Sequence, residues 1–167
     1  MNNYTVSYGG RLSGRRRALL WGCLLSWILL IFVLSSQSYQ TQSIKPALQR
    51  QLNTETVKRL LPPMSFHFKG QLYMSSFNPY DVLGFLVNKS AHLLIYAVLA
   101  GIAWSLLRMY KVSNGLAAFI ALSLTVLIAC LDEYNQQFYL SSTASPENVL
   151  IDLIGGSLGV IVLSRVK

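Results

Sequence analysis

The sequence predicts an all-α polytopic membrane protein with four transmembrane helices. Of its 167 residues, 53% are hydrophobic and only 12% are charged, and the mean hydropathy is +0.43. Four uncharged apolar runs approach the roughly 17–25 residues that a spanning helix needs. Lys and Arg gather in some of the connecting segments and are missing from others. A chain of this length and composition leaves no room for a second globular domain.

The first span is predicted at residues 18–34, after a basic arm at residues 1–17. Arg15, Arg16 and Arg17 directly precede the apolar run, a pattern that signal peptides share. The run is longer than the core of a typical signal peptide, and no Ala-x-Ala-like cleavage site follows it. We therefore expect an uncleaved membrane anchor.

Residues 35–84 are predicted to form one long loop on the outer side of the membrane. Between residues 44 and 61, apolar side chains recur at helical spacing among basic ones, and Pro62 and Pro63 end the pattern. This predicts a short amphipathic helix at residues 44–61, which either lies at the membrane interface or packs over the helix bundle. The next part of the loop is rich in aromatic residues, which favour an interfacial belt over ligand stacking.

Three further spans are predicted at residues 85–107, 115–131 and 147–164. The uncharged core of the last one, Val149–Leu163, is short for a bilayer about 30 Å thick. This helix must therefore include Glu147 and its neighbour or lie in locally thinned bilayer.

The distribution of basic residues predicts that both termini are cytoplasmic. The N-terminal arm is basic, the link between the second and third spans contains Arg108 and Lys111, and the tail contains Arg165 and Lys167. Residues 132–148 contain no Lys or Arg. Because Lys and Arg favour the cytoplasmic side, residues 132–148 are expected outside.

A net charge of +8 is explained by this orientation and by anionic lipid head groups. The chain contains no nucleic-acid-binding motif and no basic stretch interleaved with aromatic residues. The lipid bilayer is the expected partner, and no nucleic acid is expected. The oligomeric state is left open.

Polar side chains recur at three predicted helix ends that share the outer face. They are Lys89, His92 and Tyr96 in the second span, Asp132, Glu133 and Gln136 at the end of the third, and Asn148 and Asp152 at the start of the fourth. A charge near the hydrocarbon costs a few kcal/mol unless it is paired, faces protein or reaches water. We therefore expect one shared pocket, in which His92 approaches Glu133 or Asp152 directly or through water. The alternative is that the acids of the third span only end their helix in water.

Four motifs follow one another along the chain. They are Ser35-Ser36-Gln37, Lys89-x-x-His92-x-x-x-Tyr96, Asp132-Glu133-x-x-Gln136-x-Phe138 and Asn148-x-x-x-Asp152-x-x-Gly155-x-x-x-Gly159. This set resembles the VanZ-like family of bacterial integral membrane proteins. The resemblance implies a single membrane domain at residues 18–167 and a multi-pass position in a bacterial plasma membrane.

The resemblance also implies a role in the cell envelope and tolerance of glycopeptides, teicoplanin in particular. Two positions depart from the family pattern. Ser142 stands where the family has an arginine, and Asn148 stands where it has an acid. This chain therefore lacks the Arg–Asp pair of the pattern.

Three functions follow from these polar residues. In the first, all eight bind a lipid-linked or peptidoglycan-related ligand, and Lys89 and protonated His92 favour phosphate. In the second, an enzyme uses His92 with Glu133 or Asp132 as acid and base, although no nucleophile motif is present. In the third, the polar side chains only lock the helices together. No cofactor is expected, and no metal, because only one histidine is well placed as a ligand.

Overall fold

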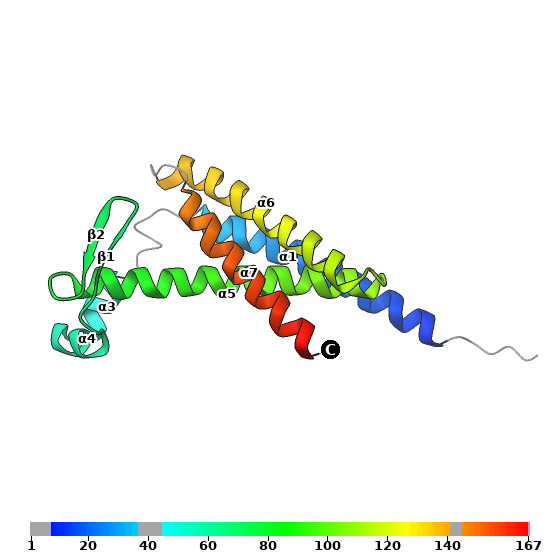
Figure 1. Cartoon of the computed structure of the whole chain (residues 1–167), viewed down its shortest axis with the longest axis horizontal. Helices are drawn as coiled ribbons and strands as arrows, with labels where there is room; N and C mark the ends of the chain where they lie inside the picture. The colour runs from blue at the N-terminus through cyan, green and yellow to red at the C-terminus, as the bar shows by residue number, and fades with distance from the viewer. Residues whose placement is uncertain (1–7, 37–44, 141–144, 167) are drawn as a thin grey trace, which may run out of the picture.

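The computed structural model describes residues 8–36, 45–140 and 145–166, which form six helices and one β-hairpin (Figure 1). In chain order the elements are α1 (Tyr8–Ser35), α3 (Lys45–Gln51), α4 (Thr54–Leu60), β1 (Ser65–Phe68), β2 (Gln71–Met74), α5 (Pro79–Met109), α6 (Asn114–Leu140) and α7 (Pro146–Val166).

Four of these helices are long and apolar enough to cross a membrane, which confirms the predicted fold class. The four segments are Gly14–Ser35, Pro79–Met109, Asn114–Phe138 and Pro146–Val166. Each extends beyond its predicted span, and α5 begins at Pro79 rather than near residue 85. Proline suits a first helical turn because its missing N–H would have no partner there.

Helix α5 is the centre of the molecule. Its 31 residues span about 46 Å, which exceeds a hydrocarbon core of roughly 30 Å. Helices α1, α6 and α7 all pack against α5, while its first turns extend past the bundle and contact α3, α4 and the hairpin (Figure 1). We call residues 45–78, which cover these first turns, the cap.

The prediction of one amphipathic helix at residues 44–61 is wrong. Two short helices, α3 and α4, stand there instead, and the helix is interrupted before Asn53. The side chain of Asn53 accepts a hydrogen bond from the backbone N–H of Glu55 at 3.2 Å, so it caps α4 and begins a new helix. Val57 of α4 is buried together with Val82 of α5, so this part of the loop packs against the first turns of α5, beyond the bundle.

The aromatic part of the loop contains a hairpin that the sequence interpretation did not include. Strands β1 and β2 pair antiparallel, and the turn between them is Lys69-Gly70, both with positive φ. Phe66 and Tyr73 stack on each other at 5.2 Å, and both rings lie about 5 Å from the ring of Phe85 in α5. These aromatic rings therefore attach the hairpin to α5.

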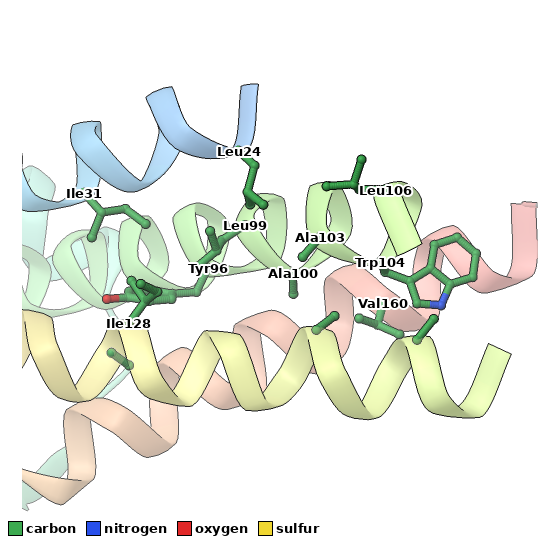
Figure 2. Packing of buried hydrophobic residues seen from close by; sticks show 13 residues of the cluster. Leu24, Ile31, Tyr96, Leu99, Ala100, Ala103, Trp104, Leu106, Ile128 and Val160 are labelled. Atoms are coloured by element: carbon green, nitrogen blue, oxygen red, sulfur yellow. The ribbon is translucent and has the colours of Figure 1, made fainter. Parts of the chain in front are cut away.

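The bundle core surrounds the middle and second half of α5. Figure 2 shows Ile31 of α1, Tyr96 of α5 and Ile128 of α6 side by side, with Trp104 and Val160 farther along. Large apolar side chains on the other faces of the four spans are exposed, which suits a surface that meets lipid tails.

Helices α5 and α7 cross so closely that there is no room for a side chain on α7 at Gly155 or Gly159. A Cβ atom at Gly155 would lie 2.8 Å from the Cα of Leu93, and one at Gly159 would lie 2.9 Å from the Cα of Ala97. Small residues at such a crossing let two backbones touch, as expected for helix pairs in membranes. This contact decides which residues of α7 face α5.

The two ends of the bundle differ in charge. Arg17 donates a hydrogen bond to the backbone oxygen of Met109 at 3.5 Å and lies over the ring of Tyr110, close to Arg108 in the sequence. We call this the basic end, and we call the opposite end, where α6 ends and α7 begins, the polar end. The helices do not determine which end faces the cytoplasm, so the orientation stays a prediction.

Candidate functional site

The polar end brings together side chains from α1, α5, α6 and α7. They form three adjoining groups: a hydrogen-bonded network around Glu133, a pair between His92 and Asp152, and a cavity beside Asp132. All eight polar residues singled out in the sequence belong to one of these groups.

The first group, which we call the Glu133 network, joins α5, α6 and α7. Glu133 is buried, and its two carboxylate oxygens accept hydrogen bonds from the backbone N–H of Ser145, at 2.7 Å, and from the side-chain amide of Asn148. The amide oxygen of Asn148 accepts a hydrogen bond from Lys89 at 2.6 Å. The ammonium of Lys89 also lies over the ring of Phe68, 5.0 Å from its centroid. Every member of this network is therefore engaged by protein groups.

The second group pairs His92 with Asp152. Nδ1 of His92 lies 3.1 Å from Oδ1 of Asp152, whose side chain is only 2% exposed. The expected approach of His92 to an acid is thus confirmed, and its partner is Asp152 rather than Glu133. A buried carboxylate in this position fixes the ring and favours the tautomer with the proton on Nδ1.

The third group is a cavity of about 220 Å³ between α1, α5 and α6, which we call the Asp132 cavity. It is lined by Ile31, Leu34, Ser35, Val87, Asn88, Ala91, His92, Ile95, Tyr96, Asp132 and Gln136. Leu34 and Val87 are also exposed on the surface of the bundle, so the cavity reaches that surface between α1 and α5. Its lining includes both apolar and polar side chains.

Two buried polar groups in this cavity are incompletely hydrogen-bonded. Asp132 is 2% exposed, and its Oδ2 accepts a hydrogen bond from the amide of Gln136 at 3.1 Å. The hydroxyl of Tyr96, which is 1% exposed, lies near the same carboxylate. Neither this hydroxyl nor Oδ1 of Asp132 makes a well-formed hydrogen bond to another residue that the structure describes, although the hydroxyls of Tyr96 and Ser35 both lie beside the carboxylate as possible donors. Unsatisfied buried polar groups are costly, which marks this place as one that a ligand or water completes.

The predicted site residues are therefore divided between two environments. His92, Tyr96, Asp132 and Gln136 line the cavity, whereas Lys89, Glu133, Asn148 and Asp152 lie beside it and bond to protein groups. Their roles in ligand binding stay predictions.

The sequence interpretation did not include the contribution of α1 to the site. Ser35 lies in the cavity wall, and Ser36 accepts a hydrogen bond from the side chain of Asn135 at 3.0 Å, which holds the end of α1 against α6. The motif Ser35-Ser36-Gln37 was the available signal, and its third residue lies outside the described residues.

A metal site is not assembled from these acids and the histidine. Within residues 8–36, 45–140 and 145–166, no three His, Cys, Asp or Glu side chains are grouped so that they could hold a metal ion. His92, Asp132, Glu133 and Asp152 do not converge on one point, because Glu133 turns toward α7 and Asp132 toward the cavity.

The comparison with protein families decides the identity of the chain. The VanZ/LLP1 family model matches residues 20–167, which is nearly the whole sequence. The chain belongs to the VanZ/LLP1 family. It is accordingly a VanZ-like multi-pass membrane protein of a family associated with glycopeptide resistance. No match was found among the curated proteins or the solved structures.

One departure from the VanZ-like pattern has a physical explanation in this structure. Asn148 donates a hydrogen bond to Glu133 and accepts one from Lys89. A carboxylate at position 148 could only accept, and it would place a second negative charge against Glu133. The amide therefore suits a position between an acid and a cation. The other departure, Ser142, lies outside the described residues.

Proposed function

We propose that this VanZ-like protein binds a lipid-linked component of the bacterial envelope in the Asp132 cavity, from the outer leaflet of the plasma membrane. By holding that component it contributes to glycopeptide tolerance, and to teicoplanin tolerance in particular. The observation that carries the proposal is a cavity that contains incompletely bonded polar groups and also reaches the bundle surface between two spanning helices.

The size and lining of the cavity favour a lipid-linked ligand over a free solute. Pockets for whole drug-sized ligands have volumes of roughly 300–1,000 Å³, so about 220 Å³ suits one head group. Ile31, Val87 and Ile95 are apolar members of the lining, which would meet the carbon chain next to that head group. The rest of the ligand then remains in the bilayer.

A second candidate function is acid–base catalysis on a lipid-linked substrate. The pair of His92 and Asp152 favours it, because a histidine that a carboxylate orients is a common general base. In this reading His92 and Asp132 face the substrate, and Asp152 only positions the ring. Glu133 is the weaker candidate base, because both of its oxygens already accept hydrogen bonds.

Deletion of the gene in its host tests the proposed function. We expect the minimal inhibitory concentration of teicoplanin to fall by more than one dilution step and that of vancomycin to change less. Complementation with wild type should restore tolerance, and complementation with Asp132→Asn should not, because the neutral amide removes the charge that faces the cavity. Asp81→Asn is the matched control, since Asp81 pairs with Lys45 in the cap at 2.6 Å and lies outside the cavity.

Protein levels in the membrane must be equal for this comparison. Full complementation by Asp132→Asn at wild-type levels would favour a purely structural role for the polar end. Unchanged tolerance after deletion would contradict the proposal itself. Turnover of a lipid-linked substrate by purified wild type, lost in His92→Gln, would favour the enzyme.

A further inference from the structure

The Asp132 cavity contains a carboxylate but no compensating cation. Among the residues that the structure describes, no Lys or Arg lines it. Lys89, the nearest candidate in the sequence, donates to Asn148 and lies over Phe68 instead. His92 does line the cavity, but its Nδ1 is directed to Asp152. The carboxylate of Asp132 therefore has no Lys or Arg beside it in the cavity.

Several groups in the cavity can accept hydrogen bonds from a ligand. Oδ1 of Asp132 can only accept while the carboxylate is charged, and the phenolic oxygen of Tyr96 can accept as well. Gln136 donates one of its two amide N–H groups to Asp132, and its oxygen is a further acceptor. Such a lining matches a ligand that donates hydrogen bonds and carries positive charge.

This arrangement changes the expected ligand chemistry. The sequence alone favoured phosphate, because Lys89 and His92 were expected to face the ligand. With both side chains engaged elsewhere, a phosphate in the cavity would lie against the charge of Asp132. Like charges at short distance in a poorly solvated site repel strongly.

We propose that the Asp132 cavity binds the ammonium head group of a lipid, whose N–H groups donate to Oδ1 of Asp132 and to the hydroxyl oxygen of Tyr96. This inference rests on the proposed function, since it names the chemical class of the same site. The apolar side chains of the lining face the carbon atoms next to the ammonium, and the acyl chains lie in the bilayer outside the gap between α1 and α5. The ammonium then supplies the missing countercharge and hydrogen bonds together.

The test uses the full chain in detergent and three phospholipids that have identical acyl chains. Phosphatidylethanolamine carries an ammonium with N–H donors, phosphatidylcholine carries a cation without N–H donors, and phosphatidylglycerol carries hydroxyl donors without a cation. Native mass spectrometry gives an apparent Kd for each. We expect ethanolamine to bind at least about tenfold more tightly than the other two, because a hydrogen bond to a charged group is among the stronger polar interactions.

Each comparison isolates one part of the proposal. Equal binding of choline would show that N–H donors are not needed, and equal binding of glycerol would show that the positive charge is not needed. Either result overturns the ammonium assignment. No preference among the three would mean that water alone completes the cavity, which overturns it too.

Two variants test whether the preference for phosphatidylethanolamine arises in the Asp132 cavity. We expect Asp132→Asn and Tyr96→Phe to reduce the preference for ethanolamine. Asp81→Asn should keep it, because Asp81, in the first turn of α5, pairs with Lys45 of the cap and does not line the cavity. Thermal unfolding in detergent identifies any variant that does not fold. If Asp132→Asn fails to fold, Tyr96→Phe alone tests whether the preference arises in the cavity, because it removes one oxygen and leaves the ring. An unchanged preference in Tyr96→Phe, or one lost equally in Asp81→Asn, contradicts the proposal.

The inference and the proposed function can fail separately. A clear preference for ethanolamine with unchanged teicoplanin tolerance after deletion would leave the ligand class standing and remove the resistance role. Teicoplanin tolerance that depends on Asp132, without any preference for an ammonium head group, would leave the resistance role standing and remove the ligand class.

Discussion

Asp132 and Glu133 are neighbours in the chain but face different surroundings. Successive side chains on an α-helix are separated by about 100° around its axis. Glu133 therefore turns toward the start of α7, where Ser145 and Asn148 donate to it, while Asp132 turns toward the cavity. One carboxylate bonds to groups at the start of α7, and the other lines the cavity.

Glu133→Gln should therefore destabilise the protein. The oxygen of the new amide could still accept from one of Ser145 and Asn148, but its NH2 would face the other, which also donates. One buried hydrogen bond would thus be replaced by opposed donors. We expect a loss of about 1–3 kcal/mol in the free energy of unfolding, as for other buried groups left unsatisfied. Thermal unfolding in detergent measures it.

The matched control is Glu55→Gln, which makes the same chemical change at an exposed position of α4. It should leave the unfolding temperature nearly unchanged. A Glu133→Gln protein as stable as Glu55→Gln would mean that the Glu133 network does not hold the helices.

The identity of the site residues could be predicted from the sequence better than their pairing. Helical spacing and a shared depth in the membrane were enough to predict that His92 would meet an acid. They could not choose between Glu133 and Asp152, because the choice depends on how α7 is rotated against α5. That rotation follows from backbone contacts at Gly155 and Gly159, which local sequence spacing does not specify.

At the scale of the helices, the crossing of α5 and α7 depends on two glycines. A methyl group at Gly159 would press on the backbone of Ala97, and backbone atoms cannot rotate aside as a side chain can. The helices would have to separate, and Asp152 would move away from His92 with them.

Gly159→Ala should thus lower stability by about 1–3 kcal/mol, the usual range for overpacking a close contact. The measurement is the unfolding temperature in detergent together with the folded fraction on size-exclusion chromatography. Gly22→Ala is the control, since nothing lies within 4 Å of a Cβ at Gly22 in α1. That variant should be as stable as wild type or slightly more stable, because alanine favours a helix over glycine. Equal stabilities of the two variants would show that the close contact at Gly159 does not determine the stability of the crossing.

The spanning helices were predictable from the sequence, and the cap was not. Long uncharged runs predict spans by themselves, because every backbone group in a bilayer must bond within its own helix. Each strand of the hairpin has only four residues, and its rings are held by Phe85 of α5 rather than by neighbours in the chain. Strands of this kind depend on tertiary contacts, and the turn Lys69-Gly70 was the only local signal.

At the scale of the whole molecule, the two ends of the bundle have different chemistry. The cap, the cavity and the Glu133 network lie at the polar end, while Arg17 and Arg108 lie at the basic end. The described start of α1 and the end of α7 also lie toward the basic end (Figure 1). Because basic residues remain on the cytoplasmic side, the polar end is expected to face outward.

Cysteine accessibility tests this orientation in intact cells. Ser76→Cys lies in the cap and Ser113→Cys lies in the turn between α5 and α6, and both positions are exposed. Ser76 is preferable to its neighbour Ser75, which is buried and hydrogen-bonded to Met64 and Pro62. With the native Cys23 and Cys130 replaced by alanine, a membrane-impermeant maleimide should label Ser76→Cys from outside and Ser113→Cys only after permeabilisation.

The reverse labelling pattern would place the polar end in the cytoplasm. The cavity would then open toward the inner leaflet, and a role in holding an envelope component outside the cell would be ruled out. The ammonium preference would survive that result, because it depends on Asp132 and Tyr96 and not on which leaflet supplies the lipid. Labelling of both positions in intact cells would instead indicate a leaky preparation, which the cysteine-free protein and a cytosolic marker protein identify. The orientation of the bundle therefore decides between an outer-leaflet and an inner-leaflet ligand for the same cavity.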